Sequence, residues 1–229
     1  ETAMRAMGNG ARHRGIEIRE HTPVRSWAVD GEGVRVTTDD ETYSADRLIV
    51  TAGAWAGSML AEMGLPLEVR RKVLFWLEVE DETPFTPERM PVYIADGPLG
   101  EIYGFPVYGQ PGLKIARHDG GLPADPDRLD RVAHPGEDED VVALARQMFP
   151  GVTGKIVSNA VCMYTMTPDA NFILDRHPEH PQVVIGAGFS GHGFKFATAI
   201  GENLVGLATD RLAQPLPILA IERFAGSRL

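Results

Sequence analysis

The sequence contains one cysteine, Cys162, among its 229 residues. An internal disulfide and a metal site built from paired cysteines are therefore excluded, we predict no metal site, and a single cysteine fits a reducing cytoplasm. Long apolar runs are also lacking, because the longest, residues 48–55 and 183–189, are too short to cross a bilayer. Since the first residues have no apolar signal core, we expect a cytoplasmic protein with no membrane partner.

Basic residues are in the minority. The chain has 22 Lys and Arg against 32 Asp and Glu, which gives a formal net charge of −10. Nucleic acid and anionic membranes repel an acidic protein, so we expect neither as a partner and favour a small molecule instead. With 43% hydrophobic and 24% charged residues, the chain has the composition of a globular protein with a substantial core.

Alternating and turn-forming residues predict the elements of the N-terminal part. Two alternating runs around the turn at residues 30–33 indicate a β-hairpin. A continuous apolar run that ends in Gly53 indicates a buried strand of a parallel sheet. The expected elements are a helix over residues 3–14, a strand over 16–19, hairpin strands over 24–29 and 34–38, a buried strand over 47–53 and a short helix over 54–62.

The character of the sequence then changes. No long helical pattern occurs between residues 69 and 117, which favours an antiparallel sheet. Pro150 stops a helix that precedes it. The expected elements are strands over residues 69–79, 92–94, 102–107 and 113–117, a surface loop over 118–139, a helix over 139–148, strands over 156–163 and 183–187, a glycine loop over 188–193 and a helix over 194–209. We therefore predict an α+β (mixed α/β) fold in which residues 1–66 and 151–229 share one domain and residues 67–150 form an antiparallel-sheet domain.

The stretch Gly186-Ala187-Gly188-Phe189-Ser190-Gly191 matches G-x-G-x-x-G between a predicted strand and a predicted helix, where such loops bind phosphate. The dinucleotide-binding fingerprint also needs an acidic residue at the end of a second strand, about 20 residues later, whereas Asp210 follows a helix. We therefore interpret the stretch as a loop that closely approaches a flat or anionic ligand. A tight strand-to-helix turn without a ligand is the alternative.

Longer motifs carry a family resemblance. They are Cys162-Met163-Tyr164-Thr165-Met166-Thr167-Pro168-Asp169, Phe172-Ile173-Leu174-Asp175, His177-Pro178-Glu179-His180 and Ala187-Gly188-Phe189-Ser190-Gly191-His192-Gly193-Phe194-Lys195-Phe196, with Tyr103-Gly104-Phe105-Pro106 and Gly112-Leu113-Lys114 upstream. With these motifs in this order, the whole chain resembles the C-terminal portion of the monomeric sarcosine oxidase and N-methyltryptophan oxidase family, FAD-dependent amine oxidoreductases of the D-amino-acid-oxidase-like superfamily. The resemblance implies that residues 1–66 and 151–229 are the remainder of an incomplete FAD-binding domain. Residues 67–150 would then bind the substrate.

The resemblance also implies a cofactor site. In the family, FAD is joined covalently to a cysteine sulfur that Cys162 matches, and a thiolate is a suitable nucleophile for such a bond. For an isolated cysteine, a small buried hydrophobic residue would be the alternative. The other implied cofactor-binding residues are Met163, Gly188, Phe189, Ser190, Gly191, His192, Gly193 and Lys195 around the flavin ring, and Val24 and Trp55 near the adenosine half.

Two lysines have implied roles in the reaction. Lys114 matches the family lysine that promotes the reaction of reduced flavin with O2, because a fixed positive charge stabilises the anion formed from O2. Lys195 matches a lysine that helps to bind the substrate carboxylate. Tyr103, Tyr164 and His118 match residues that line the substrate cavity. A solvated lysine, or a structural hydrogen bond from one of these side chains, is the alternative in each case.

The implied reaction is oxidation of a secondary amine, such as sarcosine or another N-methyl amino acid, to an imine, while O2 becomes hydrogen peroxide. A related FAD-dependent amino-acid oxidase or dehydrogenase, and an inactive binding fragment, are the alternatives. The N-terminal dinucleotide-binding βαβ unit of the family has no counterpart after Glu1, so we expect the chain alone to be inactive, to lack FAD and to self-associate at an exposed sheet edge. Bulky Phe75 and Trp76 in the strand that enters the substrate domain predict an altered cavity.

Overall fold

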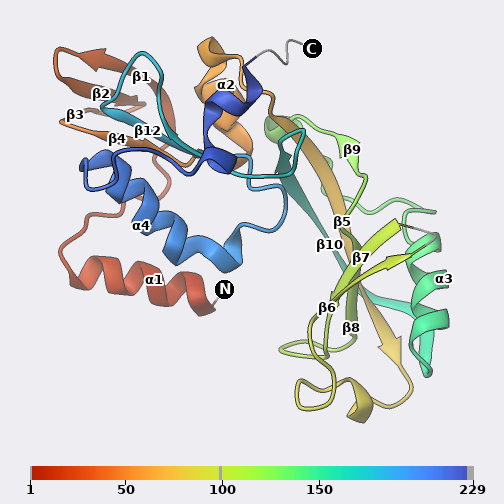
Figure 1. Ribbon diagram of the computed structural model, residues 1–229. Helices are drawn as coiled ribbons and strands as arrows, with labels where there is room; N and C mark the ends of the chain where they lie inside the picture. The colour runs from red at the N-terminus through yellow and green to blue at the C-terminus, as the bar shows by residue number, and fades with distance from the viewer. Residues whose placement is uncertain (1, 98–99, 226–229) are drawn as a thin grey trace.

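The computed structural model describes residues 2–97 and 100–225, which build three β-sheets (Figure 1). Glu1 and residues 226–229, which we assigned to the flavin-binding part, lie outside the described residues. The chain begins with helix α1 (Thr2–His13) and continues into an antiparallel three-stranded sheet. Its strands are β1 (Val24–Asp30), β2 (Gly33–Thr38) and β3 (Thr42–Ala45), in the order β1-β2-β3. The predicted helix and hairpin are therefore confirmed.

The strand predicted over residues 16–19 is wrong. Gly15 turns the chain out of α1 with a φ of 78°, and the next residues are irregular. Ile16 and Ile18 alternate as strand residues do, but they are 56% and 38% exposed. An alternating tetrapeptide without a neighbouring strand has no ladder to join, so the pattern alone does not form a strand.

The second sheet has the order β11-β12-β4 and is the buried centre of one part of the molecule. Its strands are β4 (Leu48–Val50), β11 (Ile173–Arg176) and β12 (Val183–Ala187). β4 and β12 run parallel, as we predicted, and every residue of β12 is buried. One face packs against helix α4 (Ala197–Ala208), which the short 3-10 helix η5 (Phe194–Phe196) precedes. The other face packs against Ala56 and Leu60, in and after helix α2 (Ala56–Met59).

The third sheet is antiparallel, with the order β10-β5-β8-β7-β6 and β9 beside β5. Its strands are β5 (Glu68–Val79), β6 (Tyr93–Gly97), β7 (Gly100–Phe105), β8 (Leu113–Arg117), β9 (Leu122–Pro123) and β10 (Val152–Met166). β9 lies within the stretch that we predicted as loop. β10 pairs with β5 along most of its length, so the antiparallel sheet extends beyond residue 151 to Met166.

The antiparallel sheet has one face covered by helix α3 (Glu139–Met148), which lies at the right in Figure 1. Phe75 is 2% exposed and belongs to the core formed with Val141 and Ala145 of α3. The prediction that Phe75 alters the substrate cavity is therefore wrong, because side chains alternate along β5 and this one points away from the opposite face. Trp76, the next residue, points to that opposite face.

The remaining helices are short. The helix predicted over residues 54–62 is divided into η1 (Gly53–Trp55), α2 and η2 (Ala61–Met63), and Gly64 ends it with a left-handed φ of 57°. The other 3-10 segments are η3 (Thr83–Phe85), η4 (Pro126–Arg128), η6 (Pro217–Leu219) and η7 (Ile221–Phe224). Across residues 2–97 and 100–225, none of the helices combines the length and apolar character needed to traverse a bilayer.

Candidate active site

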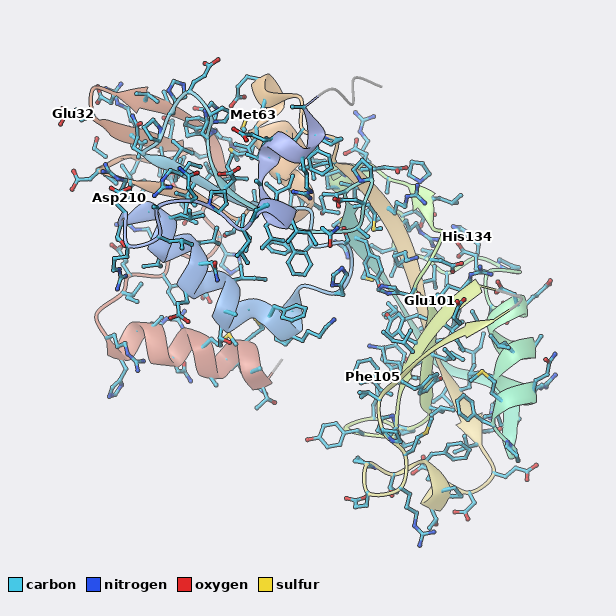
Figure 2. The ribbon with its side chains drawn as sticks, viewed as in Figure 1. Glu32, Met63, Glu101, Phe105, His134 and Asp210 are labelled. Atoms are coloured by element: carbon cyan, nitrogen blue, oxygen red, sulfur yellow. The ribbon has the colours of Figure 1, made fainter. Side chains whose placement is uncertain are left out.

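The site is built on the face of the antiparallel sheet that α3 does not cover, which we call the site face. Strand register brings its side chains together. Lys114 of β8 lies opposite Trp76 of β5 and Phe105 of β7. On β10, the residue opposite Cys162 is Lys72 of β5. In Figure 2 the labels Glu101 and Phe105 mark the two ends of β7. Residues far apart in the sequence thus share one surface.

Aromatic rings form a cluster at the edge of the site face. The ring centroid of His118 lies 5.9 Å from that of Tyr103 and 5.6 Å from that of Tyr164. The His192 ring, from the glycine loop, is 6.4 Å from His118. The Tyr164 hydroxyl and His118 Nδ1 are 3.5 Å apart, at the limit of a hydrogen bond. Three predicted substrate residues and the predicted loop histidine therefore converge.

Protonation in this cluster follows from burial. Desolvation lowers the pKa of His118, although the nearby Glu101 carboxylate opposes the shift, so the imidazole is neutral at pH 7. Burial raises the pKa of Tyr103, and the neighbouring Tyr164 raises it further. Burial also raises the pKa of Tyr164. The cluster therefore offers two phenol donors and one neutral imidazole at neutral pH.

Lys114 is surrounded by aromatic rings. Its Nζ lies 4.7 Å from the ring centroid of Phe105, 5.3 Å from that of Trp76 and 6.0 Å from that of Tyr103. Burial lowers the pKa of Lys114, and the nearby Cys162 partly opposes this shift. These contacts are within the range of cation–π attraction, so they hold a positive charge on the site face.

Cys162 is partly buried in the middle of β10. Burial raises the pKa of its thiol, whereas the charges of Lys114 and Lys72 lower it. Because successive strand residues point to opposite sides, Met163 faces away from Cys162, opposite Arg71. Any contact of Met163 with a ligand on the site face would therefore come from its backbone.

The predicted glycine loop lies against the end of β10. The Ser190 N–H donates to the Thr165 carbonyl over 2.9 Å, and the buried Ser190 hydroxyl donates to Gly188 O over 3.0 Å. Gly188 and Gly191 have φ values of 64° and 80°. A Cβ atom on Gly191 would lie 2.2 Å from Tyr164 Cε2. Glycine is thus required for the left-handed backbone and for the approach to Tyr164.

The loop also leaves donors available. Counting partners within residues 2–97 and 100–225, the backbone N–H groups of Gly191 and Gly193 make no hydrogen bond, although Gly193 is buried. A buried backbone N–H without a hydrogen-bond partner costs free energy, so the N–H of Gly193 favours a ligand that brings an acceptor. Together with the cations and the aromatic surface of the site face, these donors fit the electron-poor, carbonyl-bearing ring of a flavin. Phe189 packs on Phe172, at a centroid separation of 5.3 Å.

Three residues that we predicted to bind the cofactor or the substrate lie outside the site face. Lys195 is exposed, and its Nζ donates to the His192 carbonyl over 3.1 Å, so it follows the loop rather than the site face. Val24 and Trp55 are 43% and 41% exposed and line a cavity of about 910 Å³. Trp55 Nε1 donates to Asp127 Oδ1 over 2.8 Å. The two residues predicted near the adenosine half of FAD thus share one cavity, and their role stays a prediction.

Sequence reasoning missed Lys72. Its side chain is buried on the site face beside Cys162, and its Nζ lies 5.0 Å from the Tyr164 ring centroid. From the sequence of this strand we singled out only the bulky Phe75 and Trp76 that follow Lys72.

A parallel strand that leads into a glycine loop, beside an antiparallel sheet with cations and phenols on its free face, fits a FAD-dependent oxidoreductase. The chain belongs to the FAD dependent oxidoreductase family, whose model matches residues 1–207, and FAD is therefore the supported cofactor. The predicted family resemblance is confirmed. The chain is 38% identical over 228 residues to monomeric sarcosine oxidase from Bacillus sp. (strain B-0618), covering 97% of this chain and 58% of that protein.

One further relative and one solved structure are also similar to the chain. The chain is 34% identical to N-methyl-L-tryptophan oxidase of Yersinia pestis (strain Pestoides F), covering 95% of this chain and 57% of that protein. The structure of L-proline dehydrogenase from P. horikoshii superposes with a TM-score of 0.81 at 24% identity, covering 99% of this chain and 60% of that one. The latter likeness concerns the fold alone. The chain spans about 58% of the length of the sarcosine oxidase that it matches.

Proposed function

We propose that the protein takes part in the oxidation of a secondary amine, sarcosine or another N-methyl amino acid, to an imine, with O2 reduced to hydrogen peroxide. The observation that carries this proposal is the convergence of Tyr103, His118, Tyr164, Lys114 and Cys162 on the site face, beside the glycine loop. Similarity to oxidases that are named for N-methyl amino acids supports the substrate class.

When bound, FAD would accept the two electrons that the amine loses. We propose Cys162 as the residue that would hold FAD covalently: its sulfur would form a thioether with a ring methyl carbon, the S–H and one C–H bond would break with release of two protons, and the two electrons would pass through the flavin to O2. Burial raises the pKa of the Cys162 thiol, and the positive charges of Lys114 and Lys72 only partly oppose this shift, so the two lysines make the thiolate less unfavourable than burial alone would. The free N–H groups of Gly191 and Gly193 would donate to the carbonyl edge of the ring.

The remaining residues bind the amino acid and stabilise charge. Lys195, with the phenols of Tyr103 and Tyr164, would donate hydrogen bonds to the substrate carboxylate. Neutral His118 would accept a hydrogen bond from the amine. Lys114 would stabilise the negative charge that develops on O2, since an ammonium group fixed by three aromatic rings requires little reorganisation. One cysteine in the chain supports the cytoplasm as the site of action.

The test is anaerobic mixing of the FAD-loaded full-length protein with sarcosine, N-methyl-L-tryptophan or proline, followed by addition of O2. Bleaching of the flavin absorbance by an N-methyl amino acid, and its recovery with release of hydrogen peroxide, is the expected result. Bleaching without recovery in O2 would identify a dehydrogenase instead. No bleaching by any secondary amino acid would refute the proposal.

A further inference from the structure

Lys72 is a buried lysine for which the reaction described above has no direct use. Its side chain is 4% exposed, although lysine is rarely buried because removing an ammonium group from water is costly. Its Nζ donates to His118 O over 2.9 Å, to Gly120 O over 3.1 Å and also to Asp119 O. The three N–H donors of the ammonium therefore meet three consecutive carbonyl groups.

The chain that supplies these carbonyls is shaped to close on the ammonium. Gly120 and Gly121 have φ values of 62° and 94°, in the region that favours glycine. A Cβ atom at position 121 would lie 2.9 Å from Lys72 Cδ and 2.7 Å from Arg71 O. A side chain there would therefore push the turn away from Lys72, and the two glycines allow its close approach.

His118 is the first residue of this turn and is held on both sides. Its backbone N–H donates to Glu101 O over 2.7 Å, and its carbonyl accepts from Lys72. Its ring contacts Tyr103, Tyr164 and His192 at the edge of the site face. The direction of the ring thus depends on a backbone that Lys72 fixes.

We propose that Lys72 is a positioning residue of the substrate site, because its ammonium group gathers the carbonyls of residues 118–120 and so fixes the His118 ring against Tyr164 and His192. This inference rests on the proposed function only in that His118 contacts the substrate. The ammonium group also lies 5.0 Å from the Tyr164 ring centroid, so it contacts the same cluster directly.

The energetics make Lys72→Met a usable test. Burial lowers the pKa of Lys72 to about 8, so the folded protein disfavours the charged form compared with water. A methionine of similar length fills the same space without a buried charge, and such replacements are often tolerated. Lys72→Arg keeps the charge and the donors. Lys155→Met is the matched control, because Lys155 lies on β10 of the same sheet but is exposed and pairs with Glu78 over 2.8 Å.

The first measurement is an NMR titration of the histidine rings, with the His118 signal assigned by its loss in His118→Asn. The titratable groups around His118 are Glu101, Lys72, His192 and Lys195, together with the phenols of Tyr103 and Tyr164. The charge of Lys72 lowers the pKa of His118, so Lys72→Met should raise its midpoint, whereas Lys72→Arg and Lys155→Met should leave it near the wild-type value. An unchanged His118 titration in Lys72→Met would overturn the proposal. This readout needs no turnover.

The second measurement is the sarcosine concentration that gives half the maximal rate of anaerobic flavin reduction, in the full-length FAD-loaded protein. Lys72→Met should raise it about tenfold, which corresponds to about 1.4 kcal/mol, close to the lower end of the range for a hydrogen bond to a charged group. In a His118→Asn background the same change should have little further effect, because the two residues act through one path. Equal losses in both backgrounds would overturn the proposal. A wild-type protein that sarcosine does not reduce would refute the proposed function and leave the histidine titration as the test of Lys72.

Discussion

Gly191→Ala tests whether the glycine loop is built around Tyr164. Gly191 has a φ of 80°, and an added Cβ would lie 2.2 Å from Tyr164 Cε2 and 2.5 Å from Tyr164 Cδ2. Tyr164 is 8% exposed and contacts His118 and Lys72, so its ring cannot swing aside without losing those contacts. The substitution therefore has two costs, a strained backbone and an overpacked contact.

The magnitude follows from these two costs. A left-handed backbone costs about 1–2 kcal/mol in a non-glycine residue. Overpacking a filled site typically costs about 1–3 kcal/mol. We therefore expect Gly191→Ala to lower the free energy of unfolding by about 2–5 kcal/mol.

Two other glycines separate the costs. Gly64 has a φ of 57° with no atom within 4 Å of an added Cβ, so Gly64→Ala carries the backbone strain alone. Gly201 lies in α4 with the same free space, and alanine there should stabilise the helix by up to about 1 kcal/mol. All three positions are exposed.

The assay is urea unfolding followed by tryptophan fluorescence, with the urea dependence compared among the variants to check that one transition is measured. The expected order of stability is Gly201→Ala, then wild type, then Gly64→Ala, then Gly191→Ala. If Gly191→Ala were no less stable than Gly64→Ala, the close approach of the loop to Tyr164 would be refuted.

Three further predictions concern the site. Lys114→Met should slow reoxidation of reduced flavin by O2 by about 10²–10³-fold, with far less effect on flavin reduction, whereas Lys155→Met should change neither; stopped-flow absorbance distinguishes the two steps. Cys162→Ser should leave FAD extractable by acid precipitation, while a flavin that stays soluble after precipitation of the wild-type protein would contradict covalent attachment. Because the pKa of Lys72 is lowered to about 8 from 10.5, the unfolded chain binds more protons between these pH values, and the contribution of Lys72 to stability rises with pH. The wild type should therefore gain stability over Lys72→Met between about pH 7 and about pH 9.5 in urea unfolding, and a constant difference would contradict the shift.

Local patterns predicted the elements that depend on short-range chemistry. The hairpin of β1 and β2 follows from alternation around a glycine turn, and α3 ends before Pro150 because proline cannot continue a helix. The continuous apolar run of β12 correctly indicated a strand buried on both faces. β11 was missed, since its four residues carry too little alternation to be recognised alone.

The site itself could be predicted only in part. The motif around Cys162 identified the strand that carries it, but the neighbours of the thiol come from β5 and β8, and register between distant strands leaves no local signature. Lys72 shows the same limit. Whether a lysine in an amphipathic strand is solvated or buried depends here on a turn 46 residues later in the chain, at His118.

β10 explains how the two parts of the site are kept in register. Its central residues pair with β5 and present Cys162 and Tyr164 on the site face. Near the end of the strand, Thr165 O accepts a hydrogen bond from the Ser190 N–H. Just beyond the strand, the N–H of Thr167 donates to the Ser190 hydroxyl over 3.3 Å. Since one rigid strand carries the thiol and the phenol and also anchors the glycine loop, a displacement of the loop must strain either these hydrogen bonds or the contact of Gly191 with Tyr164. The relative position of loop and sheet is therefore fixed by the chain itself, which leaves a bound ligand to contribute affinity rather than to assemble the site.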